Sequence, residues 1–172
     1  MVVEFEVRAN VLMQPLLPTE ADEYSYPRWL RALLRKGVRR ESDGLYFRGW
    51  RAGNDPGPDD TTTEAFVNTF HLEDFVSAKL GVGSDVWARQ CVGLAVQLGR
   101  DVLELCAASD PMPVRVAITL DRGTLLYPGD PDGTVPSCTF RFYGIREGVP
   151  EYFEPPSDDD SQPFLLLSRV ER

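Results

Sequence analysis

The amino-acid sequence predicts an α+β protein, in which a mostly antiparallel β-sheet packs on one long central helix and on one or two shorter helices. Three observations lead to this prediction. Residues 84–109 have the apolar periodicity of a long helix, and several short β-rich runs follow this stretch. In addition, strands and helices do not alternate regularly, as they would around a parallel sheet. With 172 residues, the chain is most simply one domain spanning residues 1–172.

The first predicted strand and the first predicted helix lie near the N-terminus. Residues 2–8 alternate apolar and charged side chains, which is the period of a half-buried strand. In the basic helix, residues 28–40, the preceding Pro27 suits the first turn and Gly37 suits an end. One side of this helix is apolar and the other side carries arginines, namely Arg28, Arg31, Arg35 and Arg39.

The middle of the chain combines a predicted strand, a loop and an ambiguous segment. Residues 43–50 are predicted to form a strand, and residues 51–63, rich in Gly, Pro and Asp, form an acidic loop. Residues 64–71 are compatible with a strand or with the start of a helix, and we favour the strand. The long helix then begins after Ser84, which can cap it, and ends before Asp110 and the proline after it.

Four β-rich runs follow the long helix, at residues 113–120, 124–128, 138–144 and 164–170. Arg122 and Gly123 suit a hairpin turn between the first two runs. The segments near residues 128–137 and 154–163 are rich in acids and prolines, and we expect them to be flexible loops. The four runs supply most of the predicted sheet.

Composition places the chain among soluble globular proteins. Its residues are 42% hydrophobic and 26% charged. No apolar run approaches the roughly 20 residues of a membrane span, and the acidic N-terminus differs from a signal peptide. We therefore expect a cytoplasmic protein. All but two of the 18 basic residues are arginines, which suggests a bacterial source.

The three cysteines, Cys91, Cys106 and Cys138, are an odd number without a C-x-x-C pair. This pattern argues against a disulfide framework and against a zinc ribbon. Cys91 and Cys106 also fall on the apolar side of the long helix. We expect all three to be small buried hydrophobic residues with free thiols.

Charge is distributed unevenly along the chain, whose formal net charge is −9. Residues 28–51 carry eight basic and two acidic side chains, whereas residues 52–172 carry nine basic and twenty acidic ones. Such an acidic body repels nucleic acid and anionic membranes and steers a basic partner toward itself. We expect the basic helix to be neutralised within the fold, by Glu20, Asp22 and Glu23 among others.

The chain contains no signature of a phosphate-binding loop, a serine hydrolase or a zinc protease, and its glycine-rich run at residues 81–83 is incomplete. Residues 71–73, "HLE", match half of a zinc deaminase motif, but the cysteine half is missing. Residues 129–134, "GDPDGT", depart from a calcium loop at two ligand positions, so we expect a turn there. The sequence therefore predicts no metal site, no cofactor and no catalytic residue.

The function predicted from this profile is that of a non-enzymatic protein-binding module. Small acidic bacterial proteins of this kind include immunity proteins and antitoxins, whose acidic surfaces neutralise basic toxins. The predicted partner-binding acids are Asp59, Asp60, Asp158, Asp159 and Asp160.

Two alternative functions are also compatible with the sequence. The first is a small enzyme or ligand-binding protein with a cleft formed near His71, the only histidine, and nearby acids. A nucleophilic pair of Cys91 with His71 is conceivable but disfavoured, because Cys91 is expected to be buried. The second is contact with nucleic acid or a membrane through a basic face formed by Arg31, Arg35, Arg39 and Arg40. The acidic balance of the chain disfavours this second alternative and favours a protein partner.

Overall fold

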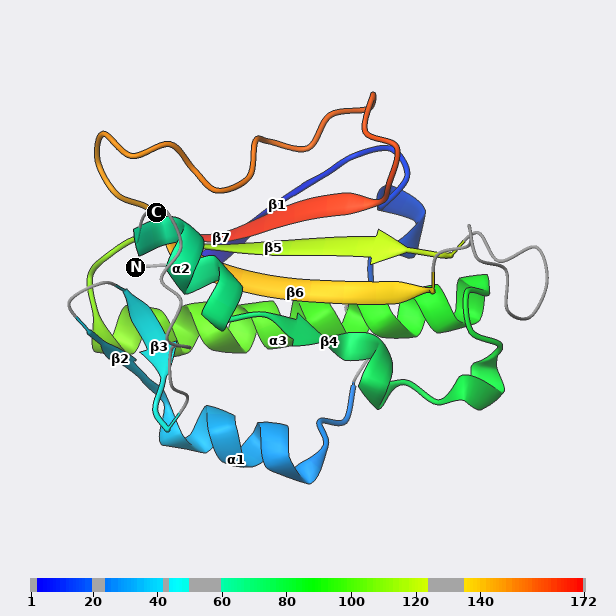
Figure 1. Cartoon of the computed structure of the whole chain (residues 1–172), viewed down its shortest axis with the longest axis horizontal. Coiled ribbons are helices and arrows are strands. Elements are labelled where there is room, and N and C mark those ends of the chain that lie inside the picture. The colour runs from blue at the N-terminus through cyan, green and yellow to red at the C-terminus, as the bar shows by residue number, and fades with distance from the viewer. Residues whose placement is uncertain (1–2, 20–23, 42–43, 50–59, 124–134, 172) are drawn as a thin grey trace.

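The computed structural model of the chain describes residues 3–19, 24–41, 44–49, 60–123 and 135–171, and it confirms the α+β prediction (Figure 1). The strands are β1 (Val3–Ala9), β2 (Val38–Arg40), β3 (Leu45–Phe47), β4 (Phe70–His71), β5 (Val114–Asp121), β6 (Ser137–Gly144) and β7 (Phe164–Glu171). The helices are α1 (Arg28–Lys36), α2 (Asp60–Val67) and α3 (Asp85–Ser109), with 3-10 turns at Gln14–Leu16, Leu72–Phe75 and Ala78–Leu80.

Five strands form one antiparallel sheet in the order β1-β7-β5-β6-β4, and β2 pairs with β3 in a separate two-stranded sheet. In the middle of the large sheet, Val116 of β5 lies opposite Phe142 of β6 and Leu167 of β7. All three side chains are buried in the main apolar core. The strands predicted from alternating apolar residues at the N-terminus and after the long helix are thus confirmed wherever the structure describes them.

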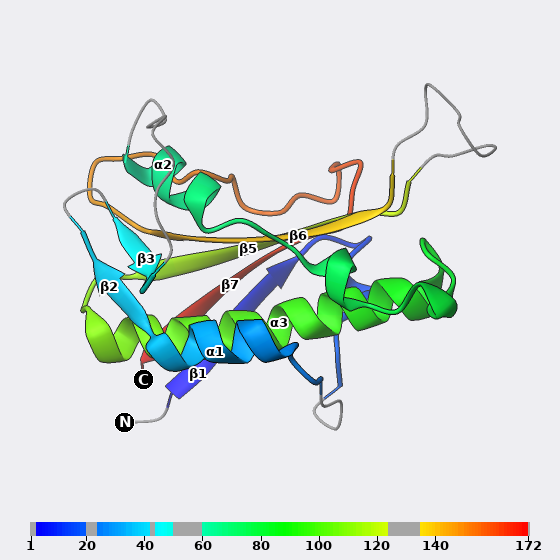
Figure 2. The same ribbon diagram turned by 60° about the horizontal axis from the view of Figure 1, so that its bottom comes forward.

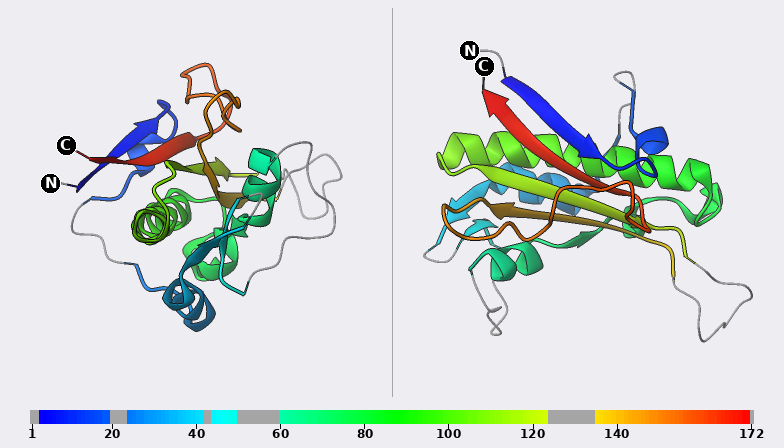
Figure 3. Two further views of the ribbon diagram at one scale, coloured as in Figure 1. Left: turned by 90° about the vertical axis from the view of Figure 1, so that its left-hand side faces the viewer. Right: turned by 90° about the horizontal axis from the view of Figure 1, so that it is seen from above.

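The two faces of the large sheet are covered differently. Helix α3 packs along one face, and α1 lies beyond α3, in contact with it and with β3 (Figures 1 and 2). The connection between β6 and β7, residues 145–163, crosses the opposite face (Figure 3). Helix α2 packs on the same face, against β6, whereas the connection itself contains no helix or strand, so its position depends on side-chain contacts.

Helix α3 has the limits that the sequence predicts. The Ser84 hydroxyl accepts a hydrogen bond from the Trp87 backbone N–H at 3.2 Å, and the helix continues to Ser109. Cys91 and Cys106 of α3 and Cys138 of β6 are buried and unpaired, as expected. Neither α3 nor any other helix in the described ranges has the length and apolar composition required to cross a membrane.

The predicted basic helix is too long, because it ends at Lys36 and residues 38–40 form β2. The backbone of Gly37 has φ 75°, a value that residues with a Cβ rarely adopt, and the helix ends there. Val38 then enters the core and pairs with Phe47 of β3. The arginines of residues 28–40 therefore belong to two different elements.

The prediction of a strand at residues 64–71 is also wrong for its first part. Residues 60–67 form α2, so the end of the predicted acidic loop at 51–63 is helical as well, and only Phe70 and His71 form a strand. The physical reason is that Glu64 is fully buried and its carboxylate accepts backbone hydrogen bonds from other elements. A pattern of apolar residues cannot reveal a buried acid.

Several expectations fall outside the described residues. They are the strand at 124–128, the hairpin that leads into it, the turn at 129–134 and most of the loop at 128–137. The same holds for Glu20, Asp22 and Glu23, which we expected to neutralise the basic helix.

Candidate functional site

The segment between β6 and β7, residues 145–163, is the candidate site, and we call it the acidic strap. It carries six acidic side chains and one basic one, and it lies on the sheet face opposite α3 (Figure 3). Its acids are Glu147, Glu151, Glu154, Asp158, Asp159 and Asp160. All of them except Asp160 are exposed, and Asp160 is half-buried.

Aromatic side chains hold the acidic strap against the sheet. The Phe153 ring lies 5.4 Å from the Phe164 ring of β7 and 6.4 Å from the Tyr143 ring of β6, centroid to centroid. Tyr143 is buried beside Ala117 and Leu166 in a second, smaller apolar cluster. Burial raises the pKa of Tyr143 to about 12, so its hydroxyl stays neutral at physiological pH. The face of the sheet opposite α3 thus has its own apolar contacts.

Hydrogen bonds fix the C-terminal half of the acidic strap. The Asn10 amide donates to the Gln162 carbonyl at 2.7 Å, and its oxygen accepts from the Phe164 N–H at 3.2 Å. The Asp158 carboxylate accepts from the Val11 N–H at 2.9 Å, which ties the strap to the residues after β1. These contacts join parts of the chain that are far apart in sequence, and they give an irregular segment a defined position.

Ion pairs fix the N-terminal half of the acidic strap. Arg115 of β5 pairs with Glu151 at 3.0 Å. Arg146 pairs at 2.9 Å with Glu64, whose carboxylate also accepts the Leu45 and Gly144 N–H groups at 2.7 and 2.9 Å. Burial raises the pKa of Glu64, although these donors and the Arg146 charge act in the opposite direction. Sequence reasoning missed this pair, because nothing near Glu64 in the sequence indicates its partners.

Three of the five predicted partner-binding acids lie in the acidic strap. Asp158, Asp159 and Asp160 are consecutive in the strap, and the Asp160 carboxylate accepts the Ser157 N–H at 2.8 Å. Asp60 is the first residue of α2, and Asp59 lies outside the described residues. The exposed Glu147 and Glu154 also lie in the acidic strap and were not predicted. The sequence feature that could have identified them is the high acid content of residues 145–163.

A cavity of about 350 Å³ lies between the acidic strap and the sheet. Its lining combines the rings of Phe153 and Phe164 with the carboxyl-bearing residues Glu154 and Asp160 and with Thr119 of β5. The acidic strap and β5 therefore border an open pocket whose lining is partly apolar and partly acidic. The sequence contains no local pattern that predicts it, because its lining joins Thr119 to residues 153–164, which are far from it in the sequence.

The described residues contain no group of three or more His, Cys, Asp or Glu side chains that could hold a metal ion. Comparison with family models, curated proteins and solved structures gives no match. What the chain does therefore has to be inferred from its own geometry.

The alternative basic face is divided between α1 and β2. Arg31 and Arg35 are exposed on α1, and neither forms an ion pair with any residue in the described ranges. On β2, by contrast, Arg39 pairs with Glu41, and Arg40 pairs with Asp110 at 3.0 Å. Two of the four predicted basic residues are thus already paired within the fold.

His71 and Cys91 do not form the nucleophilic pair that the sequence left open. The His71 imidazole is exposed and lies 3.0 Å from the Glu73 carboxylate, whereas Cys91 is fully buried. A hydrogen bond between the Cys138 thiol and the neighbouring Cys91, together with burial, raises the pKa of Cys138. His71 lines neither the cavity under the acidic strap nor a second cavity at the C-terminal end of α3.

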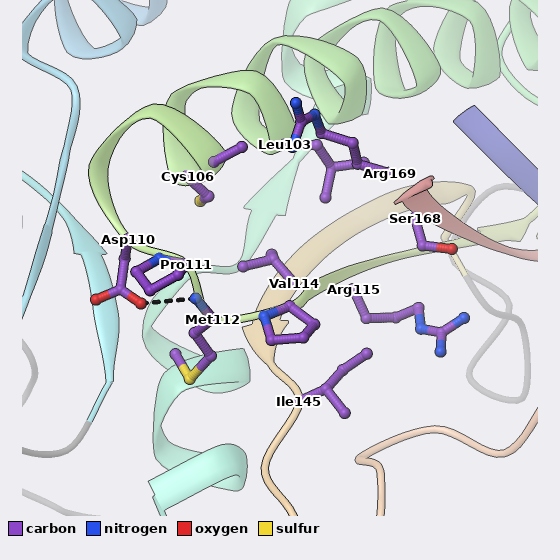
Figure 4. Close-up of a pocket in the computed structure, with 12 residues that line it drawn as sticks. Leu103, Cys106, Asp110, Pro111, Met112, Val114, Arg115, Ile145, Ser168 and Arg169 are labelled. Carbon is purple, nitrogen blue, oxygen red and sulfur yellow. Dashed lines mark hydrogen bonds between the residues drawn. The ribbon is translucent and has the colours of Figure 1, made fainter. Parts of the chain in front are cut away.

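A second cavity, of about 530 Å³, lies where the C-terminal end of α3 meets β5 and β7 (Figure 4). Asp110 at its edge is engaged by the Met112 N–H at 2.8 Å and by Arg40. The Met112 hydrogen bond and Arg40 lower the pKa of Asp110. Burial raises the pKa of Cys106 in its lining to about 12, so this thiol is not a nucleophile at neutral pH.

Proposed function

We propose that the protein is a non-enzymatic protein-binding module that binds a basic partner protein through the acidic strap. One observation chiefly supports this proposal. Five of the six acids of the strap are exposed, yet the segment that carries them is held by hydrogen bonds, ion pairs and aromatic contacts. A surface that is ordered before binding loses less conformational entropy on association. Its negative charge steers a basic partner toward it and increases the association rate.

The most specific form of the proposal is a bacterial, cytoplasmic immunity or antitoxin-type protein whose partner is a basic toxin. A toxin that acts on nucleic acid needs lysines and arginines to bind phosphates. A series of carboxylates competes for the same side chains, because carboxylate and phosphate both accept hydrogen bonds from guanidinium groups. An acidic strap is a suitable structure for such competition.

The proposal is tested by capturing partners from a lysate of the source cell with matched variants. The strap variant is Glu154→Gln with Asp159→Asn, two exposed acids that form no ion pair with the described residues. The control is Asp74→Asn with Glu104→Gln, two exposed acids outside the strap. Both variants change the net charge by the same amount and by the same chemistry.

We expect the wild type and the control to retain one basic protein in stoichiometric amount, and the strap variant to lose most of it. Retention should also weaken with added salt, because the attraction is electrostatic. The proposal is contradicted if the control loses the partner as fully as the strap variant does. It is equally contradicted if the strap variant binds like the wild type.

A second candidate function is contact with a polyanion through α1. It is supported by the exposure of Arg28, Arg31 and Arg35 and by the absence of ion pairs between them and the described residues. The net charge of −9 opposes it, since a polyanion is repelled by the rest of the molecule. Fluorescence anisotropy with a labelled single-stranded oligonucleotide tests it. Binding that is lost in Arg31→Glu with Arg35→Glu would establish this second function.

A further inference from the structure

The cavity under the acidic strap has a lining suited to a cationic side chain. Its volume of about 350 Å³ is at the lower end of the roughly 300–1,000 Å³ found for ligand pockets. That size fits a single long side chain better than a helix or strand of a partner. Phe153 and Phe164 supply aromatic rings, and Glu154 and Asp160 supply negative charge.

The protein already places one guanidinium group against one of these two rings. Arg141 of β6 has its guanidinium carbon 5.8 Å from the centroid of the Phe153 ring, in cation–π geometry. Phe153 is also the residue whose ring contacts Phe164, at 5.4 Å. Phe153 thus lines the cavity and binds a guanidinium group of the protein itself. This internal contact indicates which chemistry the ring accommodates.

We propose that the cavity receives an arginine side chain of the basic partner. The inference rests on the proposed function, because it places a partner residue against the acidic strap. A guanidinium group is planar, stacks on aromatic rings and donates paired hydrogen bonds to carboxylates. Arginine is also enriched among the few residues that dominate binding energy at interfaces. A lysine would supply the charge without the planar face, so arginine fits the two rings better.

The test is an NMR titration of the ¹⁵N-labelled full chain with N-acetyl-argininamide, and separately with N-acetyl-citrullinamide. The citrulline probe has nearly the same size and shape but lacks the positive charge. We expect the arginine probe to shift the backbone amides of Thr119, Phe153, Glu154 and Asp160. Saturation should occur at concentrations on the order of millimolar, as is usual for so small a ligand. The citrulline probe should leave these amides unchanged.

The matched variants are Phe153→Leu, in the cavity, and Phe66→Leu, on α2. Phe66 is 71% exposed and does not line the cavity, so it controls for the substitution itself. Phe153→Leu should weaken the arginine probe about fivefold through the lost cation–π contact, and Phe66→Leu should not change its binding. Glu154→Gln alters an exposed side chain and should also weaken binding of the arginine probe. This second variant tests the site even if Phe153→Leu does not fold.

Three results would overturn the arginine site. They are equal shifts with both probes, no shifts with either probe, and arginine-dependent shifts confined to residues outside the cavity. Failure of the arginine site is distinguishable from failure of the proposed function. If the partner captured by the wild type is lost by the strap variant but kept by Phe153→Leu, the strap binds the partner and the arginine site is wrong. If the strap variant keeps the partner, the proposed function itself is wrong.

Discussion

The acidic strap and helix α1 are two charged regions that lie on opposite sides of the molecule (Figures 1 and 3). The strap carries six acids and one base without any helix or strand, whereas α1 carries Arg28, Arg31, Arg35 and Lys36 on a regular helix. The strap uses part of its charge for its own structure, because Glu151, Asp158 and Asp160 all bind other groups of the protein. Among the α1 cations, Arg35 donates a hydrogen bond to the Arg31 carbonyl at 3.3 Å, and none forms an ion pair with a residue in the described ranges.

The difference shows two ways of positioning charge. On α1 the helix itself sets the spacing of the arginines, and the packing of Leu30 and Leu33 in the core holds the helix in place. In the acidic strap, side-chain contacts must both set the spacing of the acids and hold the segment in place. We therefore expect charge substitutions on α1 to leave the stability of this helix unchanged. Substitutions at the attachment points of the acidic strap should instead loosen the strap.

The largest effect is expected from Leu33→Ala, which removes the apolar contact that holds α1. Leu33 is buried, so its truncation should lower the free energy of unfolding by about 2–5 kcal/mol through lost burial and the cavity left behind. Urea denaturation measures this change. The control is Leu12→Ala, because Leu12 is largely exposed and its truncation should cost much less. Equal costs at the two positions would mean that Leu33 does not hold the helix.

The next effect is expected from Asn10→Ala, which removes an attachment point of the acidic strap. Asn10 is buried and bonds the Gln162 carbonyl and the Phe164 N–H, so both groups lose a partner. We expect a loss of about 1–3 kcal/mol in unfolding free energy. Hydrogen exchange should accelerate in the strap and remain slow in α1. Gln14→Ala, at an exposed side chain, is the control. Unchanged exchange in the strap would contradict the role given to Asn10.

A third prediction concerns pH and the buried Glu64, which pairs with Arg146, the one arginine of the acidic strap. Because burial raises the pKa of Glu64 above its value of 4.5 in an unfolded chain, the folded state binds this proton more tightly. The stabilisation is fully present below pH 4.5 and is lost as the pH rises through the raised pKa. Glu64→Gln cannot titrate, so the stability difference between wild type and variant should shrink as the pH increases. A difference that grows with pH would show that Arg146 lowers the pKa instead.

The smallest effect is expected from Arg31→Glu with Arg35→Glu on α1. Exposed charges contribute only about 0 to 1 kcal/mol each, so the thermal midpoint should change little. Differential scanning calorimetry measures the midpoint. A loss of stability as large as that caused by Leu33→Ala would show that the arginines help to hold the helix.

Much of the fold was predictable because long periodic segments dominate it. The 25 residues of α3 and the alternating strands β1, β5, β6 and β7 carry their pattern in the local sequence. The burial of the three cysteines followed from the same pattern. Short elements failed where a contact distant in sequence decides the structure. The α2 helix depends on Glu64 reaching Leu45 and Gly144, and β2 depends on its pairing with β3.

The candidate site was predictable in composition and not in geometry. The acid content identified Asp158, Asp159 and Asp160, since charge is visible residue by residue. The cavity beneath them was not predictable, because its lining joins Thr119 of β5 to Phe153 and to Phe164. The pairing of Arg40 with Asp110 was hidden for the same reason, because the two residues are far apart in the sequence. Together with the local pair of Arg39 and Glu41, it halves the predicted basic face.

The most direct test of the central claim is the dissociation constant of the captured partner for two variants that change opposite regions. One is the strap variant Glu154→Gln with Asp159→Asn, and the other is the α1 variant Arg31→Glu with Arg35→Glu. We predict that the strap variant weakens binding at least tenfold, while the α1 variant binds like the wild type. The account is contradicted if the α1 variant alone loses binding while its thermal midpoint stays unchanged, because the basic helix would then be the functional surface.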